Sequence, residues 1–199
     1  MKKVLIALMA VLITVALAGI GTYAYFSDTE TSNGNTFAAG TLDLNVDGGN
    51  TNVVKFTVTN MKPGNQPKKS FTLANVGTIN GYLDLENIVV TDAENGRLDP
   101  EIDAGDTTDG TGELQNVVNV RLFIDYGGDG WISSGDDVFY NGLVKDLPGN
   151  FELDESINAG SSINIVALFD WWNTPDDNQA QSDSMTLDIT FELGQDASQ

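Results

Sequence analysis

The segment 125–137 (DYGGDGWISSGDD) holds the residues whose types and spacing best fit a chemical role. If Asp125 is position 1 of a calcium-binding loop, Asp129 falls at position 5 and Gly130 at position 6, where the chain must turn sharply. Further oxygen-bearing groups follow at positions 7, 9 and 12, and Ca²⁺ is a hard cation that prefers oxygen ligands. The sequence therefore predicts a calcium site whose ligands are Asp125, Asp129, the Trp131 carbonyl, Ser133, Asp136 and Asp137.

Two features of this segment depart from the calcium pattern. Gly127 stands at position 3, where Asp or Asn is usual, and Asp136 at position 12 is shorter than the usual bidentate Glu. The alternative is a hairpin loop that holds no ion, because Asp and Gly are ordinary turn residues. A second acidic segment, without a clear ligand spacing, contains Asp103, Asp106, Asp109 and Glu113.

The chain contains no histidine and no cysteine. This composition excludes a His-containing triad, a His general base and the H-E-x-x-H zinc site of metallopeptidases. A catalytic zinc ion would find only carboxylates as ligands. We therefore expect a protein without enzymatic activity. Because no disulfide can form, we expect packing, hydrogen bonds and any bound metal to hold the fold.

Apolar and polar residues alternate in many short runs of the chain, which is the pattern of half-buried strands. Turns rich in Gly, Pro and Asn separate these runs, and no window after residue 24 predicts an amphipathic helix of three turns. We expect an all-β fold, a single antiparallel β-sandwich of jelly-roll type. The aromatic segment 169–172 (FDWW) is expected to cap the core, the alternative being a platform that stacks on carbohydrate.

The N-terminus has the layout of a secretory signal peptide. Two lysines precede the apolar run 4–20, and the small residues Thr22 and Ala24 follow it. We expect cleavage between Ala24 and Tyr25. The alternatives are a retained membrane anchor, because the run approaches the length of a spanning helix, and a pilin-like leader, which no processing site supports. The predicted parts are a signal peptide, 1–24, and one secreted domain, 25–199.

The chain is strongly acidic, with 29 Asp and Glu residues against 9 Lys and Arg. Loss of the two leader lysines makes the mature protein more acidic still. Such a charge repels nucleic acids and anionic membranes, so we expect neither as a partner, with membrane contact only through the leader before cleavage. Most carboxylates are expected to keep the protein soluble outside the cell, and a minority to hold divalent cations.

Two N-terminal segments carry a family resemblance: GTYAYFSDTE over residues 21–30 and TFAAGTLDL over residues 36–44. Later pieces agree with it, among them DTT from Asp106, GEL from Gly112 and LDITF over 187–191. Together they resemble the TasA/camelysin family of secreted matrix-fibre proteins over nearly the whole mature chain. The resemblance implies a jelly-roll sandwich and fibre assembly. It also leaves peptidase activity as an alternative, because camelysin-like relatives are described as metallopeptidases.

The segment 25–38 is expected to be a donor strand. It is too polar for a core strand, but a segment of this kind can add to the open sheet edge of another subunit, and the resemblance implies such donor-strand exchange in filaments. The alternative is a disordered tail. The predicted assembly residues are Tyr25, Phe26, Ser27, Asp28, Thr29, Glu30, Thr31 and Phe37.

The sequence thus predicts a secreted structural subunit, processed by signal peptidase, that polymerises with itself into extracellular fibres of a biofilm or cell-surface matrix. Calcium is the expected cofactor. Two alternatives from other classes stay open, a secreted camelysin-like metallopeptidase and a monomeric calcium-dependent surface adhesin.

Overall fold

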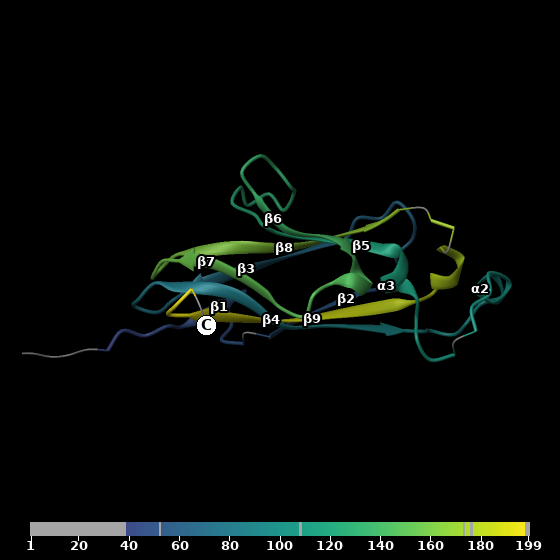
Figure 1. Ribbon diagram of the computed structural model, residues 1–199, viewed down its shortest axis with the longest axis horizontal. Coiled ribbons are helices and arrows are strands. Elements are labelled where there is room, and N and C mark those ends of the chain that lie inside the picture. The colour runs from purple at the N-terminus through teal and green to yellow at the C-terminus, as the bar shows by residue number, and fades with distance from the viewer. Residues whose placement is uncertain (1–38, 52, 108, 173, 176, 198–199) are drawn as a thin grey trace, which may run out of the picture. The chain divides into compact units, whose positions relative to one another are not determined.

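The computed structural model describes residues 39–51, 53–107, 109–172, 174–175 and 177–197 (Figure 1). The predicted signal peptide, its cleavage site at Ala24 and Tyr25, and the candidate donor strand all lie outside the described residues. Among the residues described, no helix has both the length and the apolar character needed to cross a membrane.

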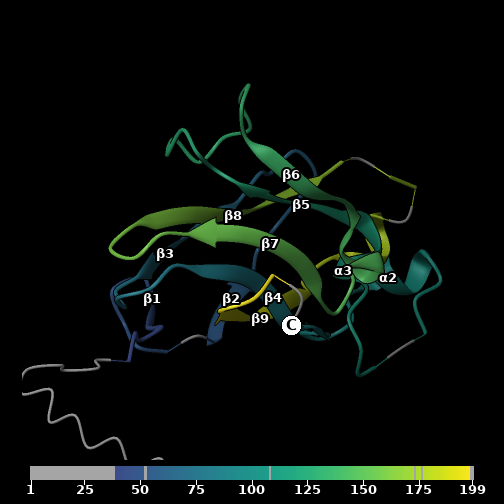
Figure 2. The same ribbon diagram turned by 60° about the vertical axis from the view of Figure 1, so that its left-hand side comes forward.

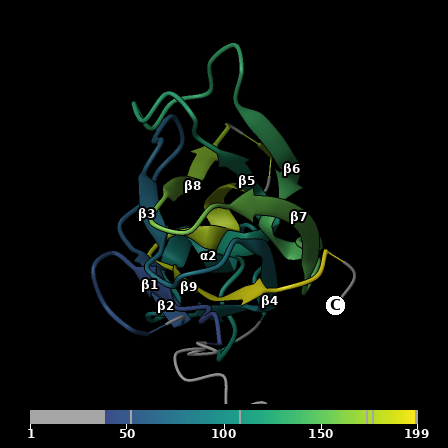
Figure 3. The ribbon, with the colours of Figure 1, turned by 90° about the vertical axis from the view of Figure 1, so that its left-hand side faces the viewer.

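Most of the described residues form two antiparallel sheets, which face each other as the layers of a sandwich (Figures 2 and 3). Sheet A has the strand order β1 (Leu44–Val46), β3 (Lys68–Asn75), β8 (Ser162–Trp171), β5 (Val118–Ile124) and β6 (Asp137–Leu143). Sheet B has the order β2 (Val53–Val58), β9 (Ser184–Gly194), β4 (Gly81–Ala93) and β7 (Phe151–Ile157). Successive strands alternate between the sheets except at the β5–β6 hairpin, which is typical of jelly-roll sandwiches. The predicted fold class is confirmed.

The alternation predicted from the sequence places one face of each strand in the core. In β9 the buried side chains recur at every second residue from Met185 to Phe191. The inward side chains of β5 and β8 meet those of β9 in the main core, and rings stack there, with the Phe56 and Phe169 centroids 5.5 Å apart. The middle of sheet A is buried on its outer face as well, where Phe123, Val166 and Leu168 form a second small cluster.

Four short helical segments occupy connections between the strands. They are α2 (Asp99–Asp103), α3 (Leu114–Val117) and the 3₁₀ turns η1 (Val144–Asp146) and η2 (Asp177–Ala180). Pro100 is the second residue of α2, where its fixed φ fits the first helical turn. The contacts of η2 with both α2 and α3 bring these segments together at one end of the sandwich (Figure 2).

The aromatic segment 169–172 divides between core and surface. Phe169 and Trp171 are buried, as the core-capping interpretation predicts, and the Trp171 indole nitrogen donates to Asp177 Oδ1 at 2.7 Å. Trp172 is instead 66% exposed. Trp172 lies one residue beyond the end of β8, whereas the side chains of β8 from Ile165 to Trp171 are all buried.

Candidate functional site

The predicted calcium loop joins β5 to β6 and rises away from the sandwich (Figure 1). The Asp125 side chain is buried at its start, and its two carboxylate oxygens accept hydrogen bonds from the backbone amides of Gly128 (2.6 Å) and Gly130 (2.7 Å). Gly130 has a φ of 73°, the left-handed conformation expected of the turn position. The loop therefore folds around Asp125.

The other carboxylates of the loop also accept hydrogen bonds from within it. Asp129 accepts one from the Trp131 amide. Asp136 accepts bonds from the Ser133 hydroxyl and amide and from the Tyr126 amide, and these bonds, with the hydroxyl foremost, lower the pKa of Asp136. Asp137 is exposed and begins β6.

Lys68, the first residue of β3, brings a positive charge to this loop. Its ammonium donates to the carbonyls of Gly130 (2.8 Å) and Asp129 (3.3 Å) and lies 3.8 Å from the centroid of the Trp131 ring. Hydrogen bonds from the loop's own backbone amides and from the Lys68 ammonium thus hold the loop in its folded conformation. Calcium binding at its six predicted residues stays a prediction.

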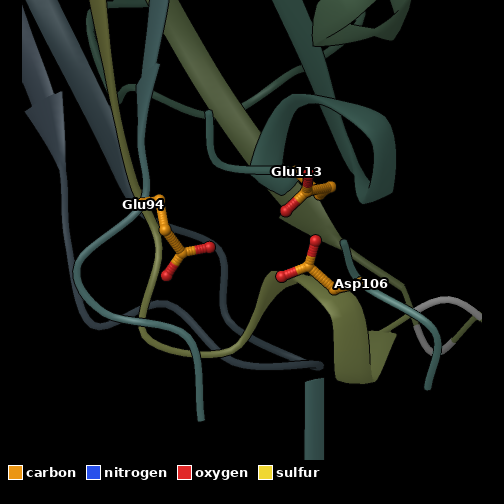
Figure 4. A group of neighbouring side chains, drawn as sticks. All are labelled: Glu94, Asp106 and Glu113. Atoms are coloured by element: carbon orange, nitrogen blue, oxygen red, sulfur yellow. The ribbon is translucent and has the colours of Figure 1, made fainter. Parts of the chain in front are cut away.

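A different set of carboxylates gathers at the end of the sandwich where α2, α3 and η2 meet. Glu94, Asp106 and Glu113 point toward one another, and one oxygen from each lies within 4.8 Å of the others (Figure 4). Glu94, Glu101 and Asp183 form a second triad of the same dimensions. We call these residues the acidic cluster; its members are Glu94, Glu101, Asp106, Glu113 and Asp183.

Separate elements position the cluster. Glu94 follows β4, Glu101 lies in α2, and Asp183 precedes β9. The second carboxylate oxygen of Glu101 accepts from the Leu98 amide, and one oxygen of Asp183 accepts from the Glu113 amide at 2.6 Å. These bonds fix the orientation of the two carboxylates.

Gly112 provides the space for one of these carboxylates. A Cβ at this position would lie 2.9 Å from the Asp183 carboxyl carbon. Any larger residue would therefore displace Asp183, which explains a glycine here by close approach rather than by backbone conformation.

Burial and mutual repulsion make the cluster electrostatically unusual. Burial raises the pKa of the Asp183 carboxyl to about 7, and the charges of Glu94, Glu113 and Glu101 act in the same direction. The pKa of Glu94 is also raised, first by burial and then by Glu101, Asp106 and Glu113. Like charges are thus held together at a cost in free energy, which a bound cation would relieve.

The sequence identified this cluster only in part. Of the second acidic segment, Asp106 and Glu113 reach the cluster, whereas Asp103 is exposed and Asp109 pairs with Arg97 at 3.0 Å. Glu94, Glu101 and Asp183 were missed because elements far apart in the sequence supply them. No local spacing connects these residues.

The third candidate feature is an open sheet edge. The pairing of β2 with β9 runs from Val58–Met185 to Val53–Thr190, whereas β9 continues to Gly194 in its pairing with β4. Within the described residues, no strand pairs with the last part of β9 on the β2 side. Backbone groups on such an edge are available to another strand.

A groove of about 500 Å³ lies beside this edge. The segment around β1 forms one wall, and β9 with β4 forms the other; the lining residues are Leu42, Leu44, Asn50, Glu86, Asn87, Thr190, Phe191, Glu192 and Leu193. The partly exposed side chains of Leu42, Leu44 and Leu193 thus lie in the same place as the open backbone edge, among polar residues.

Comparison with known families identifies the family of this chain. The sequence model of the camelysin metallo-endopeptidase family matches residues 1–119. The chain belongs to this camelysin family. No curated protein matches the chain in a sequence search.

The description of the camelysin family as metallo-endopeptidases implies a catalytic metal, and the side chains of this chain can be compared with the ligands that such a metal needs. Catalytic zinc sites combine His, Cys and carboxylate ligands with an open position for water, and this chain has neither His nor Cys. The acidic cluster offers carboxylate oxygens alone, a donor set that suits hard cations such as Ca²⁺ rather than zinc. The residues described do not match the usual zinc site of a peptidase.

Proposed function

We propose that this camelysin-family protein is a secreted, non-enzymatic subunit of extracellular fibres in a biofilm or cell-surface matrix. Its family membership, the leader-like N-terminus and the acidic, cysteine-free composition support this proposal. The observation that carries it is the edge of β9 that no described strand pairs with, which lies beside a groove lined by both apolar and polar residues.

The proposed contact is donor-strand exchange between copies of the chain. Residues 25–38 of one subunit would lie along Phe191–Gly194 of the next and extend sheet B by a strand. Backbone hydrogen bonds would supply affinity, and Tyr25, Phe26 or Phe37 would fill the groove. Because the donor and acceptor are different surfaces, the contact does not close on itself and propagates as a fibre.

The test removes the donor and leaves the acceptor intact. The processed protein should form fibres by negative-stain electron microscopy, and a chain lacking residues 25–32 should stay a folded monomer, since every described strand lies outside the deletion. A proline at Thr29 should also impair assembly, because it removes a backbone donor that a strand needs. Fibres of the truncated chain indistinguishable from wild type would refute donor-strand exchange.

A metallopeptidase is the second candidate, because the family takes its description from one. Casein hydrolysis by purified protein, abolished by chelator and restored by metal, would support this alternative. We expect no hydrolysis above that of a heat-denatured sample. Monomeric globules that attach to cells only with calcium would instead support the adhesin alternative.

A further inference from the structure

The acidic cluster has the dimensions of a calcium coordination shell. Ca²⁺ binds oxygens at about 2.3–2.6 Å, so ligands on opposite sides of the ion lie about 4.6–5.2 Å apart. The carboxylate oxygens of Glu94, Glu101 and Asp183 all lie within 4.8 Å of one another, as do those of the triad in Figure 4. Both triads share Glu94, so one ion could draw ligands from each.

A second observation indicates a missing partner. Glu101 is 0% exposed and Asp183 is 3% exposed, yet Glu101 Oε1 and Asp183 Oδ1 are buried without a hydrogen-bond partner. Buried carboxylates are normally hydrogen-bonded, paired or bound to metal. In both residues a backbone amide holds the other oxygen, and one carboxylate oxygen of each residue lies within 4.8 Å of the other and of Glu94.

Nearby basic groups do not neutralise these two carboxylates. Arg97 is close, but one terminal nitrogen donates to the Asp106 carbonyl at 3.4 Å and the other pairs with Asp109. The free oxygens of Glu101 and Asp183 therefore lack a cation among the described side chains.

We propose that the acidic cluster binds one Ca²⁺ ion through Glu94, Glu101 and Asp183, with Asp106 and Glu113 completing the site. The ion connects the end of β4, the helix α2 and the start of β9. It fastens the long connection between β4 and α3 to the sandwich, as a disulfide does in chains that contain cysteines. This site lies apart from segment 125–137, whose carboxylates already accept bonds from the loop amides.

The first experiment measures calcium binding by titration calorimetry on the processed protein. Wild type should bind one ion per chain, and Glu101→Gln with Asp183→Asn should weaken binding at least tenfold. Asp103→Asn is the matched control, because Asp103 lies in the same helix but is exposed outside the cluster. Asp125→Asn tests the loop. Both single variants should bind as wild type does.

The second readout is stability. At calcium a hundredfold above Kd, the ratio of native to unfolded protein should rise about a hundredfold, and the melting temperature by about 5–10 °C relative to chelator. The double variant should show no such shift. If it fails to fold, the single variant Glu94→Gln serves instead, since Glu94 is only partly buried.

Trypsin locates the effect on the chain. Arg97 is the only Lys or Arg between Lys69 and Arg121, and it begins the connection that the ion would fasten. Calcium should slow cleavage after Arg97 in wild type and in Asp103→Asn, but not in the double variant. Because calcium is present in all three digests, the double variant also controls for any effect of calcium on trypsin itself. The proposal is overturned if millimolar calcium changes neither melting nor cleavage, or if Asp125→Asn abolishes binding while the double variant retains it.

Discussion

Asp183 illustrates how burial changes the chemistry of one carboxylate. Its pKa in the folded protein is raised from 3.8 to about 7. The protonated form is thus favoured in the native state, so the stabilisation from this group is complete below about pH 4 and is lost as pH rises through 7. In chelator, the free energy of unfolding should therefore be higher at pH 5 than at pH 8.

The variant Asp183→Asn isolates this effect from the general charge of the chain. Urea unfolding at both pH values should show a smaller difference in the variant than in wild type, because its amide does not titrate. An identical pH dependence in the two proteins would show that Asp183 does not titrate in this range.

The aromatic segment 169–172 yields a second prediction for single residues. Phe169 is fully buried and stacks on Phe56, so Phe169→Ala should lower the free energy of unfolding by about 3–5 kcal/mol. Trp172 is exposed, so Trp172→Ala should change it by less than about 0.5 kcal/mol. Chemical denaturation of the two variants measures both values, and equal effects would contradict the division between core and surface.

Sequence reasoning succeeded for single residues where the relevant neighbours are close in the chain. The turn at Gly130 and the alternating burial in β9 follow from local rules. The same reasoning did not find Lys68, whose ammonium reaches the carbonyls of segment 125–137 from another strand. Contacts across the sheet depend on register, and a single sequence does not reveal register.

Among the elements, the unequal lengths of β2 and β9 create the proposed acceptor edge. Asn50 is exposed and lines the groove, so Asn50→Trp should fill it and reduce fibre formation while leaving the fold intact. Asn141→Trp is the matched control, because Asn141 is exposed on β6 at the edge of the other sheet. Electron microscopy and thermal melting would compare the two. Loss of fibres in the control alone would move the acceptor to β6.

The sequence predicted the strands better than the arrangement of strands. Alternation marks β2, β5 and β9, because apolar residues recur at every second position of each. The neighbours of β9 could not be predicted, since β2 and β4 are both distant in sequence and pair with it through backbone groups that every residue has. The short helices were also missed, because one or two turns carry too few residues for a helical period.

At the scale of the whole molecule, net charge should govern the proposed association of subunits. The mature chain after cleavage at Ala24 would carry 29 acidic and, without Lys2 and Lys3, 7 basic residues, and two carboxylates, Glu86 and Glu192, line the proposed groove. Subunits of like charge repel, and salt screens this repulsion over a Debye length of about 10 Å at 0.1 M and 3 Å at 1 M. Fibre formation should therefore be faster in 0.5 M than in 0.02 M sodium chloride.

Light scattering and sedimentation in the presence of chelator would measure this dependence without a contribution from calcium. Slower assembly at high salt would instead indicate that the subunits meet through complementary charges.

The contact between Lys68 and Trp131 gives the molecule an optical reporter. A cation entering segment 125–137 would repel the Lys68 ammonium, which donates to the Gly130 carbonyl and lies 3.8 Å from the centroid of the indole ring. Indole emission is sensitive to a charge so near the ring. In a Trp172→Phe background the remaining indoles are Trp171, which is buried, and Trp131, which is 47% exposed, so the emission that a soluble quencher reaches comes from Trp131. This emission should stay constant as calcium fills the acidic cluster, whereas calcium entering segment 125–137 should change it. The fluorescence of Trp131 therefore distinguishes the two candidate ion sites.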